Sequence, residues 1–293
     1  MLVIVGFVIV LGSIIGGYLM EGGKLLVLVQ PAELVIIGGS SIGAMVVGNS
    51  LTVIKSIMKS PLLLLKGSPF TKAFYLDALM LLNDFFSVMR KEGMAGVESH
   101  VEDPKNSEIF KKHPKFLAQH EAVEFFCDTI RTVSTGAVGH HELDQLMELD
   151  IETIHKEAHA PAHSLTTMAD GLPGLGIVAA VLGIILTMGA LGGPPEEIGH
   201  KVAAALVGTF LGVLLCYGFL GPMANSFGRL AEEESQCLQV VRMGIASCIK
   251  GAPAILAVEF ARRAIPTSVR PSFQEVETAC RKGPAAGSVA EAA

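Results

Sequence analysis

Two apolar stretches decide the fold: residues 172–191, LPGLGIVAAVLGIILTMGAL, and residues 202–220, VAAALVGTFLGVLLCYGFL. Neither contains Asp, Glu, Lys, Arg or His. At about 1.5 Å of rise per residue, helices of this length cross a hydrocarbon core of roughly 30 Å. The connection between them contains the sequence GGPP, so the pair is predicted to form a membrane hairpin. Both stretches are rich in Gly and Ala, which let helix backbones approach closely in lipid.

Two further apolar stretches lie near the N-terminus. Residues 2–20 carry no charge, no basic segment precedes them and no small-residue cleavage site follows, so we interpret them as a retained span and not as a signal peptide. Residues 34–54 are predicted to form another span, although several Ser, Thr and Asn residues dilute it. Because Glu33 only borders that range, all four predicted spans lack carboxylates, Lys and His.

Composition limits the class of protein. Apolar residues make up 51% of the chain and charged residues 17%, which is too apolar for an ordinary soluble domain and too charged for a chain lying wholly in lipid. The net charge of −6 argues against nucleic acid as a partner. The five cysteines fit no zinc-binding spacing, and their odd number disfavours structural disulfides.

The basic residues predict the orientation. Residues 55–170 hold 12 of the 22 Lys and Arg, and the tail after residue 221 holds eight more. By the positive-inside rule the loop, the tail and both termini are expected to be cytoplasmic. The chain is therefore predicted to be an all-α polytopic membrane protein in four parts: residues 1–54 with two spans, a helical cytoplasmic loop domain at 55–170, residues 171–222 with two spans, and cytoplasmic helices at 223–293 ending in a loose tail from Gly283.

The cytoplasmic parts show apolar residues at helical spacing. Expected helices cover residues 71–89, 114–131, 141–154, 230–249 and 252–264, and order is expected to end near residues 267–272. A set of three histidines, His155, His159 and His163, recurs every four residues and offers one helix face to a metal. Pro161 interrupts that helix and no acid or Cys completes the set, so we favour a solvated face and predict no metal site.

The absence of an intramembrane carboxylate has a consequence for ion transport. Ion-driven membrane proteins ordinarily carry the ion on an Asp or Glu within the membrane, so if this chain takes part in ion-driven work, the carboxylate must come from another subunit. Thr187 and Thr209 offer hydroxyl groups at depth to such a carrier. The alternative, favoured by pattern alone, is that each bonds back to a carbonyl of its own helix. No convergent catalytic set indicates an enzyme.

Several motifs carry a resemblance to a known family: QPAELVII at 30–37, DGLPGLGIVAA at 170–180, VGTFLG at 207–212, YGFLGP at 217–222, AVEF at 257–260 and RPSF at 270–273. Together with four spans of matching spacing, they make the chain resemble the MotA family, the ion-channel-forming stator proteins of the bacterial flagellar motor, over essentially its full length.

The resemblance implies a motility function, a place in the bacterial inner membrane and a set of partners. Five copies are expected to surround a MotB dimer, each MotB helix supplying the missing Asp, and the loop domain is expected to meet FliG of the rotor. The residues at matching positions are Arg90 and Glu98 for the rotor, Pro173 and Pro222 for coupling ion passage to movement, and Thr209 and Ala180 for facing the Asp of MotB. No cofactor beyond the coupling ion is expected.

The coupling ion and two rival functions stay open at this point. Sodium-driven relatives carry a hydroxyl residue at the Ala180 position, so protons are favoured over sodium. A TolQ or ExbB type protein, which energises a periplasmic partner, is the first rival, and such proteins typically have three spans. A self-contained transporter is the second, and it needs its own binding group at the membrane midplane.

Overall fold

The computed structural model describes residues 2–189 and 191–282, and within these the side chains of all but residues 2, 59–66 and 282. The described residues form helices and connecting turns without a strand, which confirms the predicted all-α class. The chain folds as two compact units, Met1–Gly67 with Glu157–Leu230, and Ser68–Lys156 with Ala231–Ala293. The loose tail predicted from Gly283 lies outside the described residues.

The first unit holds the helices of membrane-spanning length. Four helices of the described residues are long and apolar enough to cross a membrane, as predicted. The elements of this unit are α1 (Leu2–Met20), α2 (Leu25–Leu28), α3 (Pro31–Gly48), α4 (Leu51–Lys66), the C-terminal part of α10 (His140–Met188), α11 (Pro195–Leu214), the π-helical turn η1 (Leu215–Leu220) and the start of α12 (Gly221–Ile249). Many apolar side chains of α10 stay exposed, Leu186 at 72% for example, which suits a lipid environment.

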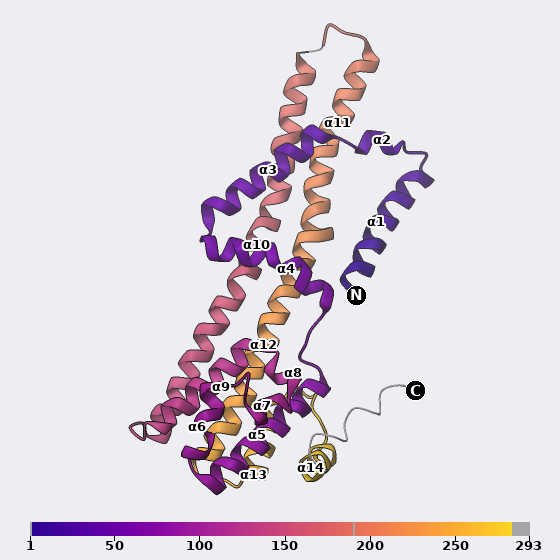
Figure 1. The fold of residues 1–293 in the computed structure, drawn as a ribbon. Helices are drawn as coiled ribbons and strands as arrows, with labels where there is room; N and C mark the ends of the chain where they lie inside the picture. Colours follow the sequence, from indigo (N-terminus) through magenta and orange to yellow (C-terminus); the bar gives the residue numbers. More distant parts are fainter. Residues whose placement is uncertain (1, 190, 283–293) are drawn as a thin grey trace. The chain divides into compact units, whose positions relative to one another are not determined.

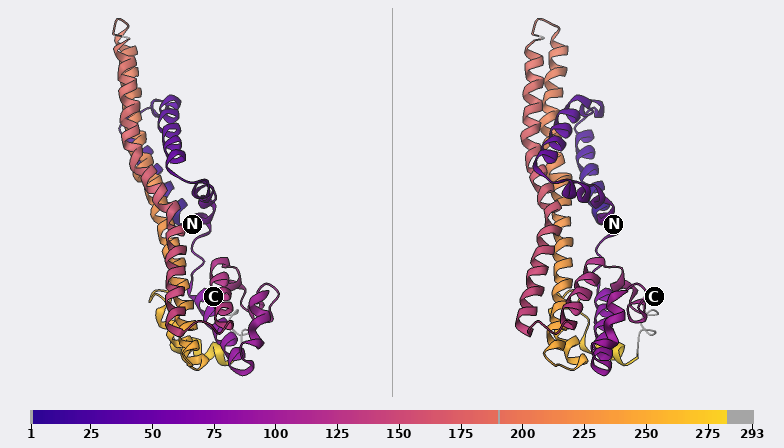
Figure 2. Two further views of the ribbon diagram at one scale, coloured as in Figure 1. Left: turned by 90° about the vertical axis from the view of Figure 1, so that its left-hand side faces the viewer. Right: turned by 60° about the vertical axis from the view of Figure 1, so that its left-hand side comes forward.

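The apolar ends of α10 and α11 form the predicted hairpin (Figure 1). The two helices run antiparallel and lie side by side in every view (Figure 2). Glycines make this approach possible: a Cβ added to Gly212 would lie only 2.5 Å from the carbonyl oxygen of Leu172. Since apolar surface gains little by burial in lipid, such backbone packing is the expected source of cohesion between these helices.

The second apolar helix is displaced from its expected range. The sequence predicts residues 34–54, whereas α3 covers Pro31–Gly48. Pro31 stands at its first turn, where a missing N–H costs nothing. The helix stops at Asn49, whose backbone is extended and whose side-chain amide donates to the carbonyl of Met45 at 2.8 Å. Glu33 therefore lies inside the apolar helical stretch Leu25–Gly48 and not at its border.

The long helix α10 differs from expectation too. Pro161 was expected to break the helix that carries His155, His159 and His163, yet α10 runs unbroken for 49 residues through Pro161 and Pro173. A proline removes one backbone hydrogen bond, but the helical turns on either side of it can continue when they are stabilised by packing. One continuous helix thus joins the predicted amphipathic segment 141–154 to the span 172–191.

The second unit is a helical domain with an aromatic core. Besides parts of α10 and α12, it contains α5 (Lys72–Glu92), α6 (Ala95–Glu102), α7 (Glu108–Lys111), α8 (Pro114–Leu117), α9 (His120–Ser134), α13 (Ala254–Ala264) and α14 (Phe273–Lys282). Phe85 meets Phe126 edge-on at 4.7 Å between ring centroids, and both are fully buried. Two expectations were wrong here: residues 114–131 divide between α8 and α9, and order continues beyond residue 272 into α14.

Candidate functional site at the α10–α11 hairpin

The site is built on the backbone contact between α10 and α11. A Cβ added to Gly176 would lie 2.9 Å from the carbonyl oxygen of Gly208 and 3.3 Å from the Cα of Thr209. One added to Gly208 would lie 3.3 Å from the backbone nitrogen of Ala180. These contacts place Ala180 and Thr209, both half-buried, at the same crossing of the two helices. The structure thus brings together the two residues that the resemblance assigns to the ion path.

The two membrane threonines differ in their hydrogen bonding. Thr187 is 1% exposed, and its hydroxyl donates to the carbonyl oxygen of Gly183 at 2.8 Å. This is the helix-internal bond that the pattern favoured for both threonines. Within residues 2–189 and 191–282, the Thr209 hydroxyl makes no hydrogen bond. Of the two, only Thr209 keeps a hydroxyl available to a group from outside the chain.

The two prolines that the resemblance assigns to coupling occupy special places in their helices. Pro173 lies inside α10, directly after Leu172, whose carbonyl group adjoins Gly212. Pro222 follows the π-helical turn η1, in which the N–H of Gly221 donates to the carbonyl of Cys216. Widened turns of this kind are rare and occur frequently at functional sites. Both prolines weaken the regular bonding of helices that form the hairpin.

The predicted rotor-facing residues lie in the second unit. Arg90 is on the last turn of α5 and Glu98 is on α6, and both are exposed. Gly93 separates the two helices with a φ of 74°, a conformation that glycine adopts without strain. Among the described residues neither Arg90 nor Glu98 forms an ion pair, so both charges are accessible to a partner.

Sequence reasoning missed Glu33 as an internal group. Its side chain is 7% exposed, and its Oε2 atom has no hydrogen-bond partner among the described residues. A Cβ added to Gly208 would lie 2.7 Å from that oxygen, so the carboxyl group sits against α11. The signal was available, since a Pro ahead of an apolar run marks a helix start and Glu33 follows Pro31 by two residues.

His163, the third of the spaced histidines, lines a cavity between α3 and α10. The cavity measures about 240 Å³ and is also lined by Ser41, Asn49, Ser164 and Thr167. Ser164 donates to the side-chain oxygen of Asn49, and the hydroxyl of Ser41 has no partner among the described residues. A cavity of this size with such a lining has room for water.

A buried ionic cluster in the second unit was missed as well. His113 is fully buried and lies 3.2 Å from an oxygen of Asp77 and 3.4 Å from an oxygen of Asp84. Burial lowers the pKa of His113, but the hydrogen bonds and charges of the two aspartates outweigh it and the net pKa is raised. Asp77 also accepts the N–H groups of Lys115 and Phe116. The cluster fixes α8 against α5.

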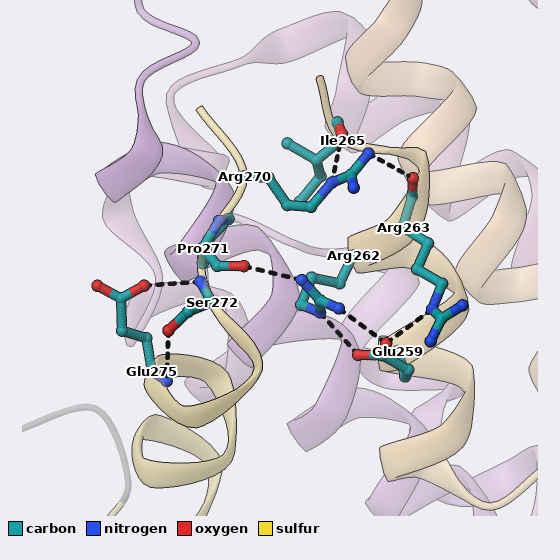
Figure 3. Close-up of polar contacts among 8 residues, drawn as sticks. All are labelled: Glu259, Arg262, Arg263, Ile265, Arg270, Pro271, Ser272 and Glu275. Carbon is teal, nitrogen blue, oxygen red and sulfur yellow. Dashed lines mark hydrogen bonds and ion pairs between the residues drawn. The ribbon is translucent and has the colours of Figure 1, made fainter. Parts of the chain in front are cut away.

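The two C-terminal motifs form one polar network (Figure 3). Arg262 makes a two-pronged ion pair with Glu259 and donates to the carbonyl of Pro271 at 3.0 Å. Its hydrogen bonds hold the pKa of Glu259 at about 2. Arg270 donates to the carbonyls of Ile265 and Arg263. AVEF and RPSF therefore fold the connection between α13 and α14, which is a structural role.

The start of α14 completes this network. The N–H of Ser272 donates to a carboxylate oxygen of Glu275 at 2.7 Å, and the N–H of Glu275 donates to the hydroxyl of Ser272 at 3.2 Å. This reciprocal pair is a capping box, which satisfies two N–H groups at a helix start. Glu275 also pairs with Lys72 of α5. The ordered helix beyond residue 272 follows from these bonds.

Comparison with known proteins identifies the family. Residues 4–93 match the model "Motility protein A N-terminal", and residues 118–240 match the "MotA/TolQ/ExbB proton channel family". The motility protein A of Escherichia coli (strain K12) is 43% identical over 277 residues, which are 94% of each chain. The chain belongs to the motility protein A family. A second relative is chemotaxis protein LafT of Vibrio parahaemolyticus. It is 36% identical to this chain, and the match covers 93% of this chain and 95% of LafT.

Solved structures agree with this membership. The fold matches "Structure of C. jejuni MotAB" with a TM-score of 0.75 at 19% identity, over 92% of this chain and 98% of that one. It also matches "Structure of the flagellar MotAB stator complex from Bacillus subtilis" with a TM-score of 0.67 at 21% identity. That match covers 94% of this chain and 98% of the other chain. As a member of this family, the chain is a multi-pass membrane protein and a stator subunit of the bacterial flagellar motor.

Proposed function

We propose that five copies of this chain surround a MotB dimer in the bacterial inner membrane and, together with it, conduct protons and turn their flow into torque on FliG. The termini, the loop domain and the tail are cytoplasmic in this arrangement. The observation that carries the proposal is the α10–α11 crossing, where glycine packing brings together Ala180 and Thr209, whose hydroxyl has no hydrogen-bond partner among the described residues. The name MotAB given to both similar structures supports MotB as the partner.

The proposed mechanism uses the charge state of the Asp that MotB supplies. An ionised carboxylate in the membrane is costly, so it seeks a hydrogen-bond donor such as the Thr209 hydroxyl. A protonated carboxyl has less need of that donor and is free to leave. Alternating protonation therefore moves the Asp from the Thr209 of one copy to that of the next. Five copies around two helices cannot all be matched at once, which favours stepwise rotation.

The helix irregularities provide the mechanical coupling in this proposal. Pro173 and the turn η1 before Pro222 are places where α10 and the helix continuing from α11 bend at low cost. A shift at Thr209 then reaches α10 and α12, which continue into the second unit that bears Arg90 and Glu98. Moving one charge through 100 mV yields about 2.3 kcal/mol, so each mechanical step of appreciable size needs several ions.

Proton flux into liposomes tests the proposal. The chain purified together with MotB should carry a proton flux that disappears when the membrane Asp of MotB is changed to Asn. The chain reconstituted alone should carry none. A flux from the chain alone at the rate of the complex would favour the self-contained transporter instead.

The choice of ion is tested in cells. Ala180 offers no side-chain oxygen to replace the hydration shell of sodium. Swimming should therefore persist when external sodium is replaced by potassium and stop when the proton gradient is collapsed. Loss of swimming on removal of sodium alone would overturn the choice of protons.

A further inference from the structure

The carboxyl group of Glu33 lies inside the apolar helical stretch Leu25–Gly48 and has no role in the mechanism above. Glu33 projects from the first turn of α3 and is 7% exposed. Its Oε2 atom has no hydrogen-bond partner among the described residues. Gly208 has no side chain to block it, so the carboxyl group reaches the α11 backbone one residue from Thr209. The same position adjoins Ala179 and Ala180, which approach Gly208 from α10.

The surroundings of Glu33 hold no opposite charge. Residues 171–195 and 202–228, which supply the facing parts of α10 and α11, contain no Asp, Glu, Lys, Arg or His, and Glu33 is the only such residue in α3. The charges that flank these ranges in the sequence are Asp170, Glu196, Lys201 and Arg229, with Lys24 before α2 and Lys55 in α4. Among the described residues none of them pairs with Glu33. An isolated buried carboxylate is costly, and ionisable residues retained inside membrane segments ordinarily serve ion movement.

We propose that Glu33 binds and releases a proton during ion passage, so that this chain supplies a second carrier in addition to the Asp of MotB. In the step concerned, the O–H bond of the Glu33 carboxylic acid breaks while an O–H bond forms on the ionised Asp of the MotB helix, directly or through one water. A proton from the side of the membrane at which protons enter then restores the carboxylic acid of Glu33. The proton is the only species transferred, so no oxidant, reductant or further reactant is needed.

The step is consistent with a glycine at position 208, against which the carboxyl group of Glu33 lies. A side chain at this position would displace the carboxyl oxygen, since its Cβ would come within 2.7 Å. Thr209 orients the Asp of MotB by its hydroxyl, whereas Glu33 exchanges protons with it. A hydroxyl group cannot do the second task, because its proton is held far too tightly at neutral pH.

The test compares Glu33→Gln, Glu33→Asp and Glu196→Gln in the complete complex with MotB. Gln keeps the size and the hydrogen-bonding atoms of Glu33 but cannot release a proton. Glu33→Gln should lower the proton flux into liposomes by about tenfold or more, in the range expected for loss of one proton-transfer group. Glu33→Asp should retain part of the flux. Glu196 is an exposed acid in the first turn of α11, so Glu196→Gln should conduct normally.

Infrared spectroscopy of the same samples gives a second readout. The C=O band of the Glu33 carboxylic acid should be absent in Glu33→Gln and shifted in Glu33→Asp. If the Gln variant does not assemble, the shift in the Asp variant still tests the role of Glu33. Normal flux in Glu33→Gln, or an identical band in the wild type and Glu33→Asp, would overturn the role of Glu33. Because the inference rests on the proposed ion-driven function, the wild-type complex is the reference, and a wild type without flux would instead refute that function.

Discussion

At the scale of single residues, the hydroxyl groups of Thr187 and Thr209 differ in their hydrogen bonding, and only that of Thr209 has a role in the proposed function. Both lie in apolar helices of the hairpin, but only Thr187 bonds to its own helix. Valine has nearly the shape of threonine and lacks the oxygen. Substitution at the two positions therefore isolates the contribution of each hydroxyl.

Thr209→Val should leave assembly with MotB intact and lower proton flux and swimming speed by roughly tenfold, because the Asp of MotB loses its donor. Thr187→Val is the matched control and should change both by less than about twofold, since its hydroxyl serves only a helix carbonyl. Proton flux in liposomes and tracking of swimming cells measure the two effects. Normal swimming of the Thr209 variant would refute the assigned role.

Glu234 predicts a pH dependence of stability. Burial, with a smaller contribution from the charge of Glu121, raises the pKa of Glu234 to about 7 from its usual 4.5. The folded unit then holds this proton more tightly than the unfolded chain, so stability falls as the pH rises from about 4.5 to 7 and levels off above. Glu234→Gln removes this loss. Its melting temperature should exceed that of the wild type near about pH 8 and match it near about pH 5.

Circular dichroism of the detergent-solubilised full chain measures these melting temperatures. Glu108→Gln is the control, because Glu108 is an exposed acid of the same unit. An equal gain for Glu234→Gln at both pH values would show that ionisation of Glu234 is not the cause.

At the scale of helices, the hairpin depends on glycines that leave no room for a side chain. A Cβ added to Gly212 would lie 2.5 Å from the carbonyl oxygen of Leu172 and 2.9 Å from the Cα of Gly176. Both are backbone atoms, so neither can rotate away. A methyl group at this position must separate the two helices.

Gly212→Ala should therefore destabilise the hairpin by about 1–3 kcal/mol, the usual cost of overpacking, and should lower the melting temperature of the purified complex. Gly199→Ala tests the helix propensity alone, because nothing lies within 4 Å of its added Cβ. That control should be neutral or slightly stabilising. A loss of stability that is equal in the two variants would mean that close packing at Gly212 is not responsible.

Features that depend on neighbouring residues in the sequence were predicted correctly, whereas features that depend on contacts between distant segments were missed. An uncharged run such as 172–191 reveals a span by itself, because length and polarity are local properties. Whether Glu33 is covered by α11 depends on neighbours distant in sequence. Pro161 failed as a helix breaker for the same reason, since packing overrides a local preference. The residues proposed to face a partner were identified by family resemblance and not by sequence pattern.

At the scale of the whole molecule, the proposed function divides ion passage and force delivery between the two units of the chain. Thr209, Ala180 and Glu33 belong to the first, Arg90 and Glu98 to the second. The helices α10 and α12 contain residues of both units without a break. Damage to one function should thus be separable from damage to the other.

Arg90→Glu should abolish or strongly reduce swimming while leaving proton flux in liposomes within about twofold of the wild type. The substitution reverses an exposed charge that forms no ion pair among the described residues, so folding has little to lose. Lys91→Glu, on the same exposed turn, is the matched control for a change of net charge and should swim better than Arg90→Glu. If the rotor reads this surface by charge, a compensating reversal on FliG should restore swimming to Arg90→Glu. A lost proton flux in Arg90→Glu would instead place Arg90 in the ion path and contradict the division between the two units.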